Sequence, residues 1–505
     1  MHTASPDTAP ERRTRAPGRS VARAGRVLAQ AAAALLVVLL LLVVVRLPWA
    51  GDLGMHAATL QRLRHSPTHP GDPLVDAGTP SPYYSPWTLL LGIVSGLTGL
   101  SVFVVLRLAA LAGLGLLVTG VHRYVRTLTP HRAAPALALL SLLLLWGPAL
   151  FEWSGFLGLN SLALTVSYPS VFALGLAFHF WAWLTRAVRQ EAAWGVWPGL
   201  GALWALILLC HQFTGVVATL GALAVLLAAR PPGAVLLRLG AGLLLGLVVL
   251  WLWPYYDFFA LFSAGTGLEA VHRPLYRDPA GRFGLVLIGV AALGARWRRD
   301  HRDPLVLFFA LGALVSAAGG LTGHYSWGRA LPAALIPAQL AAALEVVSAG
   351  RRAVRRGWAC ALLAALAAGA WTQAGTLGYV LGRDRLPGVV ADKYRAPWAG
   401  YQWIMRAGVR YGDVVMARTS AARQIPAYGP YTVAPGYPDV FLGDAGRREA
   451  AVERYFSAGT AAEERRGILR EYGVRWVVAS RAAAEPWLRK TAAGPGGHVL
   501  YRVVP

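Results

Sequence analysis

Long apolar runs separated by short polar segments recur from residue 27 to about residue 381. Each run approaches the roughly 20 residues that a helix needs to span a bilayer. Runs of this length favour transmembrane helices over the core helices of a soluble domain. The pattern predicts about eleven such helices, at approximately residues 27–47, 100–121, 133–150, 168–185, 195–229 (two helices), 239–254, 282–295, 304–321, 330–349 and 358–381.

The pattern changes at residue 382, where charged residues become more frequent and the long apolar runs stop. Short apolar or alternating segments favour strands, and two longer segments have helical periodicity ending at a suitable stop, Gly473. Residues 382–505 therefore predict a small α/β domain outside the membrane. Its expected strands are residues 413–417, 474–478 and 498–504, and its expected helices are residues 447–456 and 461–472.

Composition supports a membrane protein, because 56% of the 505 residues are hydrophobic and only 14% are charged. The mean hydropathy is +0.48, and a soluble chain of this length could not bury so much apolar surface. The two cysteines, Cys210 and Cys360, each lie inside an apolar run. Neither a disulfide framework nor a zinc site is indicated.

The formal net charge of +24 raises the alternative of a nucleic-acid-binding protein. Arginines, however, gather in short tracts between the apolar runs, as the positive-inside rule predicts for cytoplasmic loops. Their placement favours a plasma-membrane protein without a nucleic-acid partner. These tracts are Arg123–Arg126, Arg186–Arg189, Arg296–Arg302 and Arg351–Arg356.

The same rule sets the expected orientation. Residues 1–26 are polar and basic, and we expect a disordered cytoplasmic tail. The apolar run 27–47 is longer than the core of a cleaved signal peptide, so we expect a retained helix. Residues 49–86 then form an external loop, residues 27–381 the membrane domain, and residues 382–505 an extracytoplasmic domain.

The external loop after the first helix carries the leading candidate for chemistry. Asp52 directly follows the apolar run, where water or lipid headgroups make an ionised carboxylate tolerable. It could cap a short following helix or act on a substrate, and the two interpretations are compatible. His56 is four residues further on, so on a helix it shares a face with Asp52.

Two further candidates lie near helix ends. Glu152 follows the third apolar run, and acids so close to a membrane tend to be functional or paired. It could assist Asp52 across a cleft or be an ordinary interfacial acid. His211 lies between two apolar runs and is either a phosphate or sugar ligand or a hydrogen-bonded interfacial histidine.

Arginines on the expected external side are informative because the positive-inside bias disfavours them there. Arg273 follows the seventh apolar run, and Arg329 ends the polar and aromatic segment that includes His324 and Tyr325. Arginine recognises phosphate through a bidentate fork. We therefore expect these residues to contact an anionic lipid-linked group, with interfacial snorkelling as the alternative.

Some chemistries are not indicated. The sequence contains no G-x-x-x-x-G-K-[ST] phosphate loop, no H-E-x-x-H zinc helix and no G-x-S-x-G nucleophile elbow. Charged residues are almost missing from the middle of the apolar runs. Ion-coupled pumps usually need such residues, so the pattern disfavours a transporter.

Four short motifs resemble the GT-C superfamily of membrane glycosyltransferases. They are Gly51-Asp52 followed by His56, Tyr84-Ser85-Pro86-Trp87 leading into the next apolar segment, His211-Gln212-Phe213-Thr214-Gly215, and the Arg-x-Leu-Pro turn at residues 329–332. The pattern of residues 461–478 is similar to an external domain often attached to such proteins. The resemblance implies an all-α polytopic membrane bundle with a small C-terminal extracytoplasmic α/β domain.

The resemblance also implies a function. The family transfers sugars from polyprenyl-phosphate carriers, here to an envelope glycan, lipid or protein, and a single displacement would invert the anomeric centre. Asp52 and, less securely, Glu152 would be catalytic. Substrate binding would fall to His56, Tyr84, His211, Arg273, His324, Tyr325 and Arg329.

This chain departs from the family in having a lone Asp52 where many members have an acid pair or a D-x-D-like motif. The departure leaves the use of a divalent metal, Mg²⁺ or Mn²⁺, open, and no other cofactor is indicated. It also keeps two other classes of function open. One is a transporter or flippase of lipid-linked intermediates, and the other is a degenerate scaffold whose external domain binds a partner.

Overall fold

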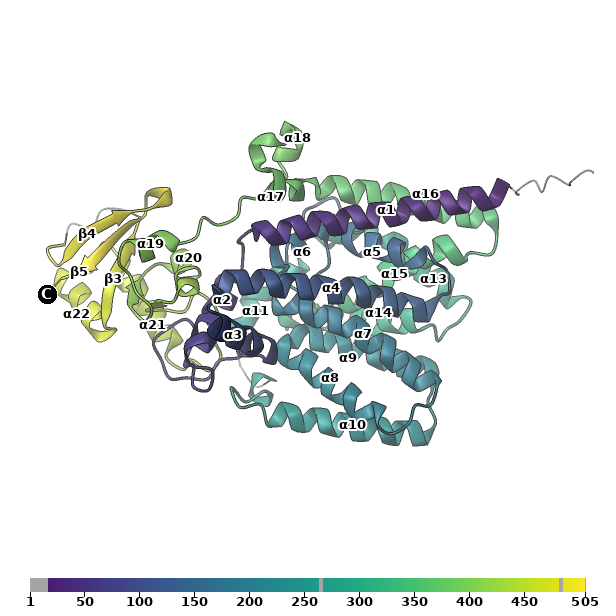
Figure 1. Cartoon of the computed structure of the whole chain (residues 1–505), viewed down its shortest axis with the longest axis horizontal. Helices are drawn as coiled ribbons and strands as arrows, with labels where there is room; N and C mark the ends of the chain where they lie inside the picture. The colour runs from purple at the N-terminus through teal and green to yellow at the C-terminus, as the bar shows by residue number, and fades with distance from the viewer. Residues whose placement is uncertain (1–16, 263–266, 481–484, 505) are drawn as a thin grey trace, which may run out of the picture.

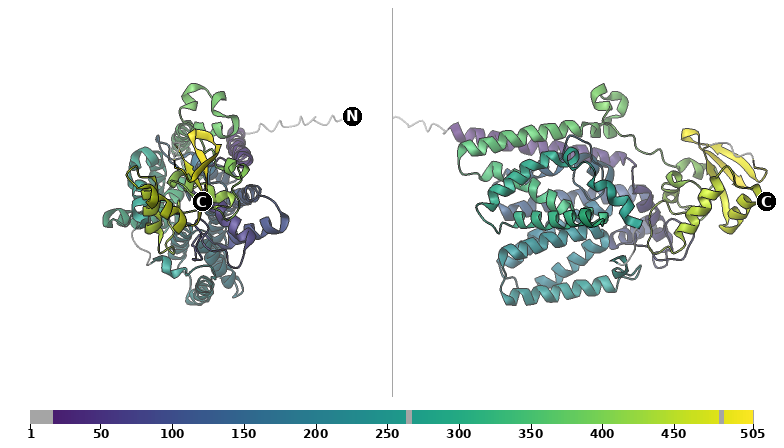
Figure 2. Two further views of the ribbon diagram at one scale, coloured as in Figure 1. Left: turned by 90° about the vertical axis from the view of Figure 1, so that its left-hand side faces the viewer. Right: turned by 180° about the vertical axis from the view of Figure 1, so that it is seen from behind.

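The structure is a computed structural model that describes residues 17–262, 267–480 and 485–504. An elongated helical bundle carries a small α/β domain at one end (Figures 1 and 2). The first helix, α1 (Pro17–Arg46), starts at the opposite end of the bundle. Residues 17–26, which we expected in the tail, form the start of this helix, and the disorder expected for residues 1–16 lies outside the described residues.

The bundle is that of a multi-pass membrane protein. In the described part of the chain, nine helical spans are long and apolar enough to cross a membrane, and the shorter α5 (Ala134–Leu144) and α8 (Val196–Cys210) lie among them (Figure 1). Each apolar segment predicted from the sequence is therefore helical. The spans lie in α1, α4 (Val102–Leu128), α7 (Pro169–Arg189), α9 (Gln212–Ala229), α10 (Gly233–Trp251), α12 (Pro279–Phe283) with η3 (Gly284–Val286) and α13 (Leu287–Trp297), α14 (Pro304–Thr322), η4 (Tyr325–Ala330) with α15 (Pro332–Ser348), and α16 (Arg352–Thr372).

The Tyr84–Trp87 motif opens a separate short helix, α3 (Pro86–Thr98), and not the membrane span α4. Ser85 caps α3 by accepting a hydrogen bond from a backbone N–H of its first turn. Gly99 then ends α3 in the left-handed conformation (φ +71°), which glycine adopts without strain, and Ser101 caps α4. The apolar pattern alone did not reveal this break.

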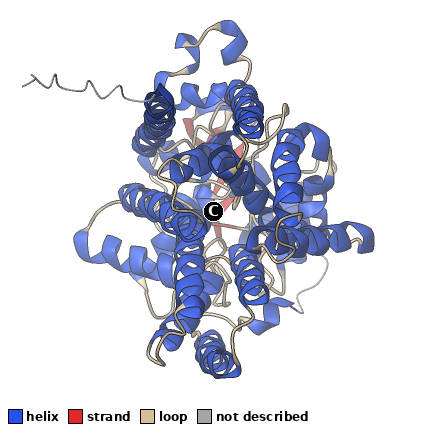
Figure 3. Ribbon diagram, turned by 90° about the vertical axis from the view of Figure 1, so that its right-hand side faces the viewer, coloured by secondary structure: helices blue, strands red, loops and turns tan. Residues whose placement is uncertain are grey.

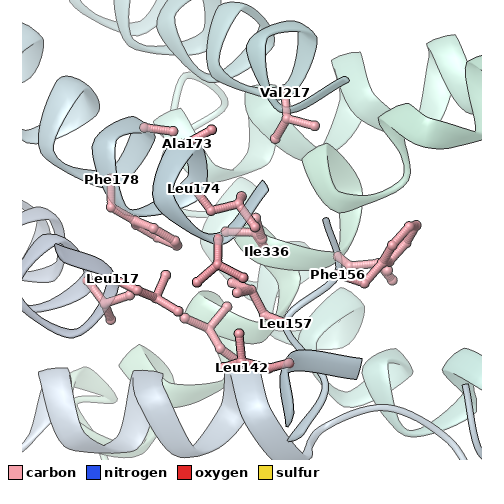
Figure 4. Packing of buried hydrophobic residues seen from close by; sticks show 14 of the residues in the cluster. Leu117, Leu142, Phe156, Leu157, Ala173, Leu174, Phe178, Val217 and Ile336 are labelled. Carbon is pink, nitrogen blue, oxygen red and sulfur yellow. The ribbon is translucent and has the colours of Figure 1, made fainter. Parts of the chain in front are cut away.

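The bundle packs through small residues and interlocking aliphatic side chains. Figure 3 views the molecule from the end of the bundle opposite the C-terminal domain, and the strands of that domain lie behind the packed helices. A Cβ atom on Gly120 of α4 would lie 2.8 Å from the carbonyl oxygen of Gly175 in α7, so glycine permits this close approach. Leu142, Val217 and Ile336 come from three other helices and meet in the same buried cluster (Figure 4).

The C-terminal domain contains a five-stranded mixed sheet in the order β2-β1-β3-β5-β4. β1 runs parallel to β2 and β3, whereas β5 is antiparallel to β3 and β4. The predicted strands and helices are confirmed, but β2 is too short and β4 too exposed to show a clear pattern. The elements are β1 (Val414–Met416), β2 (Tyr431–Thr432), β3 (Val474–Ala479), β4 (Leu488–Ala493), β5 (Val499–Val503), α21 (Ala445–Phe456) and α22 (Ala462–Glu471).

The first loop docks on this domain. The side chain of Arg62 in α2 (Leu53–His65) is buried and donates hydrogen bonds to the carbonyls of Gly429 and Pro430, each at 2.8 Å. Val75 forms a parallel bridge with Thr432 of β2. The loop therefore continues the edge of the sheet.

Short elements complete the chain between these parts. They are α6 (Leu159–Thr165), η1 (Phe259–Phe262), α11 (Gly267–His272), η2 (Arg273–Tyr276), η5 (Ala374–Leu377), α17 (Gly378–Leu381), η6 (Arg383–Arg385), α18 (Gly388–Ala391), α19 (Gln402–Arg406), α20 (Thr419–Ala422), η7 (Ile425–Tyr428) and η8 (Pro495–Gly497).

Candidate active site

Asp52 lies in the turn between α1 and α2, at the end of the bundle that carries the C-terminal domain (Figure 1). No backbone N–H of α2, all of whose residues the structure describes, donates a capping hydrogen bond to its carboxylate. Its backbone angles, φ −84° and ψ 6°, differ from the extended conformation that is usual for a capping residue. The capping interpretation is therefore wrong, and the partly buried carboxylate is left for another role.

Two opposing effects act on this carboxylate. Burial raises the pKa of Asp52 above its usual value, and the guanidinium groups of Arg329 and Arg423 act in the opposite direction. Arg329 comes from η4 of the bundle, and Arg423 follows α20 of the C-terminal domain. The carboxylate thus lies in a field of two cations from distant parts of the chain, and its raised pKa makes it a stronger base than an exposed aspartate.

Two tyrosines hold the backbone of the Asp52 turn. The hydroxyl of Tyr168 donates to the carbonyl of Ala50, and the hydroxyl of Tyr437 contacts the carbonyls of Gly51 at 2.8 Å and Arg423 at 3.0 Å. Tyr168 begins the α7 region, and Tyr437 belongs to the C-terminal domain. The position of the turn is therefore set jointly by the membrane bundle and the C-terminal domain.

His56 lies on α2 one turn after Asp52, with its ring edge against the ring of Tyr168 at a centroid distance of 4.7 Å. Burial lowers the pKa of His56 to about 3. The ring is therefore neutral at physiological pH and can both donate and accept a hydrogen bond. It suits the positioning of a hydroxyl group better than the binding of an anion.

Arg329 is buried beside the loop after α5 and the tip of the α8–α9 hairpin. Its Nη1 donates to the carbonyl of Ser154 at 2.8 Å, and its guanidinium lies 4.6 Å from the centre of the Phe213 ring. Its Nε has no hydrogen-bond partner among the described residues. A buried guanidinium with an unused N–H is unusual, because buried polar groups are normally paired. The arrangement favours an anionic ligand.

His211 faces the same guanidinium. The backbone N–H of Thr214 donates to His211 Nδ1 at 3.2 Å, which caps α9. Thr214 Oγ1 lies 2.8 Å from the same Nδ1, and Nε2 lies 3.4 Å from Nη2 of Arg329. The guanidinium can only donate, and at 3.4 Å the ring is a distant partner for it. An acceptor oxygen beside Arg329 would therefore be a better partner for its N–H groups.

An aromatic wall closes this region. The ring of His272 in α11 lies 5.3 Å from that of Phe213 and 6.1 Å from that of Trp153. Its Nδ1 is 2.7 Å from the carbonyl of Leu268, and burial together with the charge of Arg329 lowers the pKa of His272 to about 4. Nδ1–H therefore donates to that carbonyl, and the neutral Nε2 is an acceptor. His272 was not among the site residues predicted from the sequence.

Glu152 lies in a different environment from Asp52. Asn160 donates to its Oε1 at 2.8 Å, and Nε of Arg395 lies 3.3 Å from the same oxygen. Burial raises the pKa of Glu152, and Arg395 and Asn160 oppose that shift. Within the described residues, these partners, and not Asp52, are in polar contact with Glu152. Its catalytic role stays a prediction.

The other predicted substrate-binding residues lie away from Asp52 in their described contacts. Tyr84 is buried within the first loop, where its hydroxyl donates to the carbonyl of Gly71 at 2.8 Å. Arg273 is exposed over the ring of Tyr325, with its guanidinium 5.7 Å from the ring centre, and His324 is exposed. Their roles in binding stay predictions, whereas His56, His211 and Arg329 surround one region with Asp52.

The surroundings of Asp52 do not suit a divalent cation. Over the described ranges, no group of three or more His, Cys, Asp or Glu side chains could hold a metal ion. Asp52 and His56 would have to supply the ligands, and the charges of Arg329 and Arg423 beside Asp52 would repel a further cation. The open alternative of Mg²⁺ or Mn²⁺ therefore finds no supporting donor set there.

The residues that the sequence analysis missed share one property. Tyr168, Tyr437 and Arg423 act on the Asp52 turn from remote positions of the chain. None belongs to a motif with a fixed spacing from Asp52. For His272 alone the sequence offered an indication of a site residue, because it lies beside Arg273 on a segment rich in polar residues.

Comparisons with known proteins agree with this architecture. No protein-family model and no curated protein matches the sequence. Among solved structures, the mycobacterial arabinofuranosyltransferase AftD aligns with 94% of this chain and 40% of its own, at 17% identity and a TM-score of 0.54. A mutant form of that enzyme aligns with 94% of this chain and 41% of its own, at 17% identity and a TM-score of 0.55. The Archaeoglobus fulgidus oligosaccharyltransferase aligns with 88% of this chain and 69% of its own, at 12% identity and a TM-score of 0.47.

The likeness to the arabinofuranosyltransferase shows that this chain shares the fold of that membrane protein, which is the kind of architecture that its motifs predicted. The chain spans about 40% of the length of that enzyme. At this level of identity the comparison shows the architecture, and the activity has to be argued from the site itself.

Proposed function

We propose that the protein is a membrane glycosyltransferase that moves a sugar from a polyprenyl-phosphate donor to an envelope acceptor. The observation that carries the proposal is the arrangement of Arg329 and His211. Nη2 of the buried guanidinium reaches Nε2 of His211 only at 3.4 Å, and the Nε of the same guanidinium has no described partner. A phosphate oxygen would complete this arrangement, and Asp52 lies close enough for its charge to act on Arg329.

The positions of the basic residues support a reaction on the extracytoplasmic face of the plasma membrane. Asp52 follows the last residues of α1, whereas the basic start of α1 lies at the opposite end of the bundle (Figure 1). The end of α7 lies beside the end of α4, where Arg189 of α7 donates a hydrogen bond to the carbonyl of Thr127 in α4. With these basic ends in the cytoplasm, Asp52 and the C-terminal domain are outside.

The proposed reaction is a single displacement at the anomeric carbon of the donor sugar. An acceptor hydroxyl oxygen forms a bond to that carbon, and the bond between the carbon and the phosphate oxygen breaks. The electron pair of the broken bond leaves with the polyprenyl phosphate, whose negative charge Arg329 and His211 stabilise. The hydroxyl proton passes to Asp52, which acts as the general base. The product has the inverted anomeric configuration.

The test uses purified full-length protein in nanodiscs with a panel of polyprenyl-phosphate sugars and envelope glycans. General-base catalysis is worth roughly 100-fold or more, so we expect Asp52→Asn to lower kcat by at least that factor. Arg329→Gln should raise the donor KM and lower kcat, because the leaving phosphate loses its cation. Asp76→Asn and Arg277→Gln, which change exposed residues of the same charge, should leave both constants near those of the unchanged protein.

The outcomes separate the alternatives. Transfer that survives Asp52→Asn would assign the base to another residue, with Glu152 the first to examine. Product with retained configuration would contradict the single displacement. No cleavage of any donor by folded protein would contradict the glycosyltransferase proposal and favour the flippase or the scaffold.

A further inference from the structure

A cavity of about 660 Å³ lies between the C-terminal domain and α11 of the bundle. Its walls come from α20, from the segment after β2 and from α21, and Leu268 of α11 closes one side. Ligand-binding pockets commonly measure roughly 300–1,000 Å³, so the cavity has the size for a ligand of several sugar units or similar bulk. We call it the α21 cavity.

The α21 cavity adjoins the Asp52 turn through two residues. Arg423 and Tyr437 both line the cavity. The charge of Arg423 acts on Asp52, and the hydroxyl of Tyr437 bonds to the carbonyl of Gly51. Gly54 lets the domain come this close, since a Cβ atom there would lie 1.8 Å from the carbonyl oxygen of Arg423. A ligand in the cavity would therefore contact two residues that act on the proposed base or its turn.

The charge of the cavity wall differs from that of the Arg329 region. Glu449 and Glu453 of α21 line the cavity, and no salt bridge or hydrogen bond engages either carboxylate within the described residues. Most other acids of this domain have an arginine partner: Asp413, Asp444, Glu463, Glu464, Glu471 and Glu485. Arg423 also lines the cavity, where its charge acts on Asp52. In a chain with a net charge of +24, the two exposed glutamates therefore make the α21 side of the cavity locally negative.

We propose that the α21 cavity binds the acceptor, and that this acceptor is a glycan without negative charge. The proposal rests on the proposed function, because it gives the second substrate of the same reaction a place. Carboxylates accept strong hydrogen bonds from hydroxyl groups, which every sugar ring supplies. The same carboxylates repel phosphate and uronate groups, so the anionic donor is directed to Arg329 and the neutral acceptor to the cavity.

The test separates binding of the acceptor from cleavage of the donor. Glu449→Ala combined with Glu453→Ala removes both carboxylates, and Glu463→Ala combined with Glu464→Ala makes the same charge change outside the cavity. With neutral mannose and arabinofuranose oligosaccharides as acceptors, we expect the cavity variant to raise the acceptor KM about tenfold, a change of 1.4 kcal/mol. Hydrolysis of the donor by water, measured without glycan, should not change.

An acceptor KM within twofold of that of the unchanged protein would overturn the inference while leaving the proposed function intact. If the unchanged protein neither hydrolyses nor transfers the donor sugar, that result would instead contradict the proposed function. In that case binding is measured directly, by saturation-transfer NMR of the same oligosaccharides on the full-length protein. Binding that the cavity variant weakens supports the cavity as a glycan site, and binding that it leaves unchanged, or no binding to the unchanged protein, overturns it.

Discussion

At the scale of single residues, Asp52 combines a cost to stability with a proposed chemical role. Burial raises its pKa, so the folded protein holds the proton more tightly than the unfolded chain does. Folding stability contributed by this group therefore falls as the pH rises from about 4 through the raised pKa. The ionised form of the carboxylate is kept in place at a cost to stability, which is common for groups that serve function and not stability.

We therefore predict that Asp52→Asn, which should lower kcat by roughly 100-fold or more, does not lower the thermal midpoint at pH 7.5. The amide is neutral, as the protonated acid is, and needs no desolvation of a charge. The difference in thermal midpoint between Asp52→Asn and the unchanged protein should shrink as the pH is lowered towards 5, because more of the acid is then protonated. Thermal unfolding in detergent at several pH values measures this, with Asp76→Asn as the exposed control. A lower midpoint at pH 7.5 would show that the carboxylate has a structural partner.

At the scale of elements, a buried arginine of α2 contacts the C-terminal domain, beside a hydrogen bond from Gln61 to the carbonyl of Ala427. Arg62 is 1% exposed, donates to the carbonyls of Gly429 and Pro430, and lies 3.6 Å from the centre of the Tyr431 ring. Asp52 directly precedes the same helix. The contact that docks the domain thus also orients the element that begins at the proposed base.

Replacing this arginine should weaken the docking. Arg62→Leu removes the side-chain donor of the buried Pro430 carbonyl, which costs about 1–3 kcal/mol for such a group, and it removes the contact with the Tyr431 ring. The carbonyl of Gly429 keeps the backbone N–H of Gly412 as a donor. We expect a lower thermal midpoint and faster hydrogen exchange in residues 53–65 and 429–432. Arg64→Leu is the matched control, because Arg64 makes no side-chain hydrogen bond or ion pair in the described part of the chain. Equal effects of the two substitutions would contradict the role of Arg62.

At the scale of the whole molecule, the first loop and the C-terminal domain meet at a buried acid. Ser81 donates to Asp439, and Tyr83 donates to the carbonyl of Pro438. Burial raises the pKa of Asp439 from 3.8 to about 7. The folded protein retains this proton at pH values where the unfolded chain has released it, so the stability of the contact falls between about pH 4 and pH 7 and then levels off.

We predict that this contact is the pH-sensitive part of the docked arrangement. Hydrogen exchange of residues 72–85 should become faster as the pH rises from 5 to 7.5, after correction for the intrinsic pH dependence of exchange. Asp439→Asn should remove most of that change, since the amide does not titrate. Residues 102–128 of α4 serve as the internal reference within the bundle. A pH response that Asp439→Asn leaves unchanged would assign it to another group.

The sequence by itself determined the membrane bundle, the small α/β domain and their order along the chain. Helices that span a bilayer need long apolar runs, and buried strands and amphipathic helices have short periods, so both patterns are local and can be read from neighbouring residues. The break between α3 and α4 was missed because Gly99 and Ser101 end one apolar helix and begin another within a continuous apolar pattern.

Only the tertiary structure decided how the site is assembled. The sequence identified Asp52, His211 and Arg329 one by one, but it could not show that Arg423 and Tyr437, nearly 400 residues after Asp52, would reach the same turn. Such contacts depend on how the domain docks, which no local period records. For the same reason the cap expected of Asp52 was wrong: the turn is held by tyrosines from elsewhere in the chain, and the carboxylate is left facing the arginines.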